Sequence, residues 1–162
     1  MAKKTAECGM LVALAMIFSY VEALIPINFG IPGIKLGLAN LVVLYGLYMM
    51  KPCEVLVVSI TRILLIGFLF GNGMSIIYSL AGGLLSFAVM LPLTRVKKLS
   101  PIGVSTVGAV SHNIGQILVA AAILKSAGLF YYLPALMISG VVTGSLMGVL
   151  IQRILKILPS VK

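Results

Sequence analysis

Six long apolar runs follow one another along the chain, and they constrain its fold more than any other feature. They span residues 6–26, 34–50, 52–70, 72–93, 101–124 and 132–152. A helix of about 17–25 apolar residues is long enough to cross the hydrocarbon layer of a membrane. Because 61% of the 162 residues are hydrophobic and only 9% are charged, a water-soluble core of this size cannot bury the apolar surface. The runs predict an all-α integral membrane protein, a bundle of six transmembrane helices in one domain, 1–162.

Basic residues predict the orientation of these helices, because cytoplasmic loops of membrane proteins are enriched in lysine and arginine. If the N-terminus is cytoplasmic, nine of the twelve basic residues fall on the cytoplasmic side: Lys3, Lys4, Lys51, Arg95, Lys97, Lys98, Arg153, Lys156 and Lys162. We therefore expect both termini to be cytoplasmic and the protein to reside in the cell membrane. The same topology explains the net charge of +9, so no nucleic-acid partner is expected.

Polar residues within the apolar runs are the candidate ligand-binding residues. An ionisable side chain at mid-membrane costs at least about 2.5–3.5 kcal/mol and is a functional candidate by default. Most of these polar positions lie in the outer half or at the midplane of their predicted helices, where a pocket open to the outside would form. The candidates are Glu22, Lys35, Asn40, Arg62, His112, Asn113 and Gln116, with residues 27–33 as a lid. Their surplus of positive charge predicts an anionic ligand.

A structural role is the alternative for each candidate. Glu22 can neutralise Arg62 or Lys35, since intramembrane charges usually pair. His112, Asn113, Gln116 and Asn40 can join helices by hydrogen bonds. Lys35 can anchor its helix at the lipid headgroups.

Small residues repeat at helical spacing in two runs. Gly140, Gly144 and Gly148 share one face of the sixth run, and Gly9 with Ala13 forms a shorter pair in the first. Such residues let two helix backbones approach closely, either within one bundle or between a bundle and a membrane partner.

Several chemistries lack the residues that they need. The sequence has no P-loop, no CxxCH motif for haem attachment, too few ligands for a zinc or other metal site, and no acid near its single histidine for a catalytic triad. With three acidic residues, all of them glutamate, it supplies no evident catalytic residue. We therefore do not expect an enzyme.

Three segments carry a family resemblance: IPGIKLGLANLVVLYGLYMMKP, FLFGNGMSIIYSLAGGLLS and GAVSHNIGQILVAA. With these blocks the chain resembles the Gx transporter family, which is also labelled heptaprenyl diphosphate synthase component I and is similar to the substrate-binding S components of energy-coupling factor (ECF) transporters. The resemblance implies six helices, a site near the outer face capped by the first loop, and a membrane subunit with two ATPases as partners. Gly9 and Ala13 would be the docking residues.

Two further functions follow from the same resemblance. Some relatives are encoded beside flavin-based electron-transfer systems, which implies a non-covalent flavin or quinone and an electron-transfer partner. The synthase label implies an accessory membrane subunit of isoprenoid synthesis, although prenyl diphosphate synthases use Asp-rich motifs and this chain has no Asp. Our leading expectation is a substrate-binding membrane protein whose ligand is a vitamin, a flavin or a prenyl phosphate.

Overall fold

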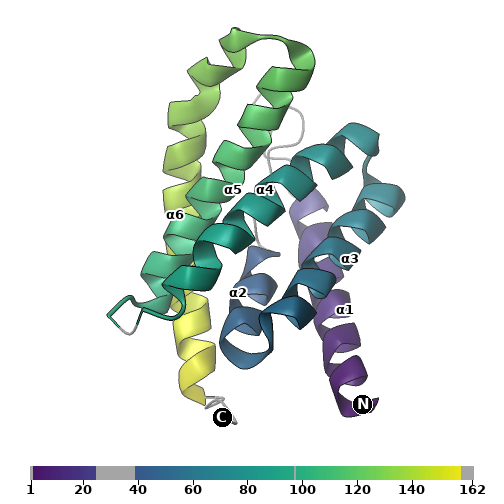
Figure 1. The fold of residues 1–162 in the computed structure, drawn as a ribbon, viewed down its shortest axis with the longest axis vertical. Helices are drawn as coiled ribbons and strands as arrows, with labels where there is room; N and C mark the ends of the chain where they lie inside the picture. Colours follow the sequence, from purple (N-terminus) through teal and green to yellow (C-terminus); the bar gives the residue numbers. More distant parts are fainter. Residues whose placement is uncertain (1, 25–38, 97, 158–162) are drawn as a thin grey trace.

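The computed structural model describes residues 2–24, 39–96 and 98–157, and all regular structure in this part of the chain is helical. Six α-helices follow in order, with one 3₁₀-helix before the last (Figure 1). Their bounds are α1 (Ala2–Leu24), α2 (Asn40–Met49), α3 (Pro52–Phe70), α4 (Gly73–Leu93), α5 (Pro101–Leu124), η1 (Ala127–Tyr132) and α6 (Leu133–Ile157).

Local sequence signals fix where α3, α4 and α5 begin. Pro52 and Pro101 occupy the first helical positions, where a missing N–H is harmless. Asn72 Oδ1 accepts a hydrogen bond of 2.8 Å from the Ser75 N–H, and Ser100 Oγ accepts one of 3.2 Å from the Gly103 N–H. These side chains satisfy backbone donors that a helix start leaves open.

Five of the described helical segments are long and apolar enough to cross a membrane, so the chain is a multi-pass membrane protein of the predicted all-helical class. α2 is the exception, because its ten residues span about 15 Å, half of a hydrocarbon layer of about 30 Å. Residues 34–38 of the predicted second run lie outside the described residues. The count of six spanning helices therefore stays a prediction.

Two groups of helices make up the bundle (Figure 1). α5 packs most extensively against α6 and α4, whereas α1 packs mainly against α3. Among the described elements, α1 contacts only α3 and α2. α2 lies between the groups and buries Leu41–Leu44 and Leu47, as expected for a helix that is apolar on every side. The hydrophobic core gathers around α2, towards the end of the bundle that holds both termini.

The three glycines of α6 lie against α5. A Cβ atom added to Gly148 would be 2.5 Å from Ile102 Cα, and one added to Gly144 would be 2.7 Å from Thr106 Cα. Gly140 lies beside the backbone of Val110. The structure thus places this stripe inside the bundle.

The shorter small-residue pair has different surroundings. Gly9 and Ala13 lie exposed on α1, and nothing lies within 4 Å of a Cβ added to Gly9. Their role in docking a partner stays a prediction.

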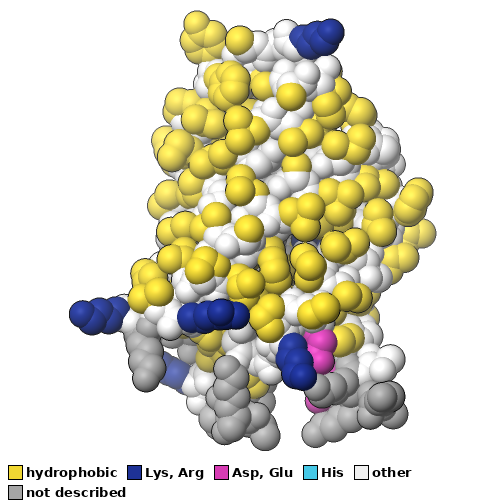
Figure 2. Space-filling view, viewed as in Figure 1, with side chains coloured by type: hydrophobic (Ala, Val, Ile, Leu, Met, Phe, Trp, Pro, Cys, Tyr) yellow, Lys and Arg dark blue, Asp and Glu magenta, His cyan; other side chains and the backbone are white. Residues whose placement is uncertain are grey.

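Charged and apolar side chains are segregated along the bundle (Figure 2). A broad band of apolar side chains covers the face in view, and basic side chains collect at the end where the termini lie. The connections at that end carry Lys51, Arg95 and Lys98, and the last turns of α6 carry Arg153 and Lys156. Lys125 follows α5 at the opposite end. The predicted asymmetry of basic residues is therefore present in three dimensions.

Candidate functional site

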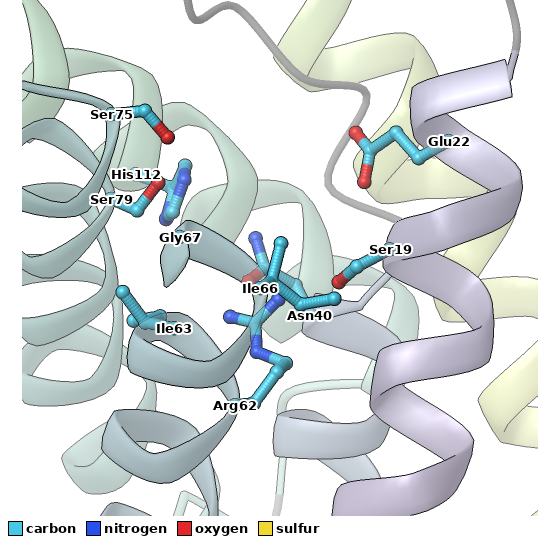
Figure 3. Close-up of a pocket in the computed structure, with 10 residues that line it drawn as sticks. All are labelled: Ser19, Glu22, Asn40, Arg62, Ile63, Ile66, Gly67, Ser75, Ser79 and His112. Carbon is cyan, nitrogen blue, oxygen red and sulfur yellow. The ribbon is translucent and has the colours of Figure 1, made fainter. Parts of the chain in front are cut away.

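A cavity lies in the half of the bundle farther from the termini. Its empty volume is about 430 Å³, which includes open space at its mouth. All five helices from α1 to α5 contribute to its wall (Figure 3). The lining residues that the structure describes are Ser19, Glu22, Asn40, Arg62, Ile63, Ile66, Gly67, Ser75, Ser79 and His112.

Arg62 provides the positive charge of this cavity. It lies ten residues after the start of α3, about 15 Å along the helix, and only 8% of it is exposed. Its guanidinium points into the space between α1 and His112 (Figure 3). Its Nε is buried without a hydrogen-bond partner among the described residues. A buried donor without a partner costs about 1–3 kcal/mol, and more when it is charged.

Glu22 and Ser19 form the α1 side of the cavity. They are three residues apart and therefore lie on the same face of the helix. Glu22 is 7% exposed and Ser19 is 4% exposed, and both side chains point toward the cavity (Figure 3). The carboxylate of Glu22 and the guanidinium of Arg62 attract one another electrostatically. The cavity therefore contains charges of both signs.

The opposite side of the cavity consists of Ser75 and Ser79 on α4 and His112 on α5. Two glycines let these helices meet there. A Cβ on Gly82 would be 2.7 Å from the His112 carbonyl oxygen, and a Cβ on Gly115 would be 2.9 Å from the Ala81 carbonyl oxygen. Close approach of the two backbones thus places His112 beside the serine hydroxyls.

Asn40 is the cavity residue of α2, at the first position of that helix. It also lines a second, smaller cavity of about 230 Å³ that includes Met90, Ala109, Thr143 and Met147. Asn40 therefore borders both the charged cavity and this second cavity.

The structure brings together four of the seven predicted ligand contacts: Glu22, Asn40, Arg62 and His112. Lys35 and the predicted lid at residues 27–33 lie outside the described residues. Asn113 and Gln116 are buried but do not line the cavity among the described residues. Gln116 Cγ would lie 2.8 Å from a Cβ on Gly82, and Gln116 Nε2 is buried without a hydrogen-bond partner in the described part of the chain.

Asn113 makes an interhelical hydrogen bond. Its Nδ2 donates to the Leu136 carbonyl oxygen over 2.8 Å and so joins α5 to α6. We expect Asn113→Leu to lower the free energy of unfolding by about 1–2 kcal/mol, because the change removes the hydrogen bond that joins α5 to α6 and buries an apolar side chain against a polar carbonyl. Thermal unfolding in detergent measures the change, with ligand content measured in parallel.

A neighbouring position provides the control for this prediction. Ser111 Oγ donates to the Val107 carbonyl oxygen of its own helix, and Ser111→Ala should therefore have a smaller effect. Equal melting temperatures for Asn113→Leu and wild type would contradict the prediction.

Sequence reasoning missed the three serines of the cavity. The available signal was their spacing, since Ser75 and Ser79 are four residues apart on α4 and Ser19 is three residues before Glu22. A hydroxyl is inexpensive to place in a membrane helix, so serines do not stand out from an apolar run as charges do.

One family matches most of the sequence. The family described as heptaprenyl diphosphate synthase component I matches residues 11–154, a range that contains all of the described cavity residues. This match confirms the resemblance that the sequence blocks indicated. No curated protein and no solved structure gives a significant match. The chain therefore belongs to the heptaprenyl diphosphate synthase component I family.

Proposed function

We propose that this membrane protein binds a small anionic molecule from the side opposite its termini and serves as the substrate-binding component of a transporter. The observation that carries the proposal is Arg62, a buried cation that points into a cavity and has a buried Nε without a partner among the described residues. Membrane proteins retain such costly charges mainly where the charge has a function. An anion in the cavity would supply acceptors for the guanidinium.

Neutral polar groups complete a suitable environment for an anion. The hydroxyls of Ser19, Ser75 and Ser79 and the Asn40 amide can each donate a hydrogen bond to an oxyanion. His112 lies on the same wall as Ser75 and Ser79. Ile63 and Ile66 supply apolar contacts, and such mixtures of few polar and several apolar groups are typical of small-molecule sites.

The positions of the basic residues support the proposed direction of binding. Lys51, Arg95, Lys98, Arg153 and Lys156 belong to the end of the bundle that holds the termini, and the cavity lies toward the other end. Under the rule that cytoplasmic loops are positively charged, the termini face the cytoplasm. The cavity then faces the outside of the cell membrane.

A transport function would require partner proteins. The chain has no P-loop of its own, so ATP hydrolysis would come from separate subunits. The resemblance to ECF substrate-binding components implies a membrane subunit and two ATPases for this task. Gly9 and Ala13, both exposed on α1, are the proposed contact residues.

Extraction of the bound molecule tests the proposal. We would purify the protein in a mild detergent, record its absorbance spectrum and identify co-extracted small molecules by mass spectrometry. Ser79→Phe, which fills the cavity without changing its charge, should abolish retention of the ligand. Leu84→Phe is the matched control, because Leu84 lies on the same helix but is 48% exposed.

The outcomes separate the candidate functions. A colourless anion that is retained by wild type and Leu84→Phe but lost from Ser79→Phe supports the proposed binding function. A stoichiometric flavin or quinone at the same site favours transport of that cofactor or a role in electron transfer. A protein without any ligand, co-purifying with a soluble prenyl diphosphate synthase, contradicts the proposal and favours an accessory subunit of isoprenoid synthesis.

A further inference from the structure

The cavity contains two opposite charges that come from different helices. Among its described lining residues, Glu22 is the one carboxylate and Arg62 the one fixed cation. Each is more than nine-tenths buried, at 7% and 8% exposure. The two side chains extend into the cavity from different walls, and they attract one another across it (Figure 3).

This arrangement differs from an ion pair sealed between packed helices. In a sealed pair, both charges are covered by apolar side chains and no third group can reach them. Here the cavity lies between the charged groups, and its wall carries further hydrogen-bond donors at Ser19, Asn40 and Ser79. An anion that enters the cavity would therefore meet the guanidinium and the carboxylate together.

We propose that Glu22 is the built-in counter-ion of Arg62, and that a ligand binds by placing its own anionic group at the guanidinium in place of the carboxylate. This inference rests on the proposed function and names the class of ligand. Replacing one carboxylate by another gains little, because both groups present the same charge and the same pair of oxygens. A phosphate or diphosphate group carries more charge and more acceptor oxygens for the arginine fork and the neighbouring hydroxyls.

Glu22 therefore acts as a specificity-determining residue. It excludes monovalent carboxylates, which cannot compete with it, and admits phosphoryl groups, which can. Removing its charge should strengthen the binding of every anion, because the repulsion between ligand and carboxylate disappears. We expect Glu22→Gln to lower the concentration of pyrophosphate needed for half-maximal binding about tenfold, a change that corresponds to about 1.4 kcal/mol.

Thermal shift in detergent, with sodium acetate, phosphate and pyrophosphate at equal ionic strength, tests the inference. An anion that binds the folded protein raises its melting temperature. The wild type should respond to pyrophosphate and phosphate but hardly to acetate. Glu22→Gln should respond to all three, and at lower concentrations. Arg62→Gln should respond to none beyond the general effect of salt.

Glu7→Gln is the matched control, because Glu7 lies on the same helix about 22 Å from Glu22 at 1.5 Å per residue. It should respond as the wild type does. If Glu22→Gln binds these anions no better than Glu7→Gln, the inference is wrong. It is also wrong if both variants and the wild type respond to none of the anions.

If Glu22→Gln does not fold, the inference can still be tested by whether its fold can be restored. An arginine without its counter-ion would be the cause, so either added pyrophosphate or the second substitution in Glu22→Gln/Arg62→Gln should restore a folded protein. Failure of both to restore it would overturn the inference. If the wild-type protein retains an anion on extraction but Glu22→Gln binds the tested anions no more tightly than the wild type, the counter-ion role of Glu22 is disproved and the proposed function still stands. Without any extracted ligand and without any response to anions, the proposed function fails as well.

Discussion

We expect the Arg62→Gln variant to bind the molecule that co-purifies with the wild type at least about 30-fold more weakly than the wild type does. Truncating one partner of a buried, hydrogen-bonded charge pair costs about 2–5 kcal/mol, and each 1.4 kcal/mol is a factor of ten in affinity. The reason is geometric as well as electrostatic, because the planar guanidinium of Arg62 presents several donors to the same cavity. Isothermal titration with the identified ligand measures the loss.

Arg62→Lys refines this prediction. Lysine keeps the charge and its insertion cost in the membrane, but it lacks the fork that binds an oxyanion through two parallel hydrogen bonds. We therefore expect an affinity between those of the wild type and Arg62→Gln. If charge alone mattered, Arg62→Lys would bind as the wild type does.

Arg153→Gln is the control for the loss of a basic residue. Arg153 is exposed near the end of α6, a helix that contributes no residue to the described lining of the cavity. Its replacement should leave affinity unchanged. Size-exclusion profiles and melting temperatures of all three variants separate loss of binding from loss of fold. Unchanged affinity in a folded Arg62→Gln protein would contradict the site assignment.

The positions of the helices were predictable where the sequence contains residues that typically begin or end a helix. The predicted ranges 52–70 and 101–124 coincide with α3 and α5, because a proline begins each helix and a polar or basic residue precedes it. α6 instead continues to Ile157, five residues beyond the predicted run. A hydropathy run ends where charged residues begin, and Arg153 and Lys156 lie in the last turns of α6, so the apolar run stops before the helix does.

The polar residues that line the cavity were in part predictable as candidates, but the way in which they come together was not. Glu22, Arg62 and His112 stand out because each is costly in an apolar run. The sequence does not indicate which of them face the same cavity, since this depends on how α1, α3 and α5 pack. His112 and Gln116 share a helix face and both pack beside Gly82, yet of these two residues only His112 is among the described lining of the cavity.

Gly148→Ala is expected to lower the free energy of unfolding by about 1–3 kcal/mol, the usual range for overpacking a well-packed interior. The added methyl group would lie 2.5 Å from Ile102 Cα and 3.1 Å from Ser105 Cβ, so α5 and α6 would have to separate. A backbone atom cannot rotate away as the end of a flexible side chain can. Gly144→Ala should behave alike, because its Cβ would meet Thr106 Cα at 2.7 Å.

Gly9→Ala is the matched control for these substitutions and should have the opposite sign. Nothing lies within 4 Å of its Cβ, and replacing glycine by alanine within a helix adds about 0.5–1 kcal/mol of stability. Thermal unfolding of the three variants in one detergent gives the comparison. The close approach of α6 to the backbone of α5 depends on the glycines of α6. Equal melting temperatures for Gly148→Ala and Gly9→Ala would therefore show that the two helices do not pack in this register. A loss confined to the α6 glycines would instead assign their stripe to the stability of the bundle and leave the exposed face of α1 available to a partner.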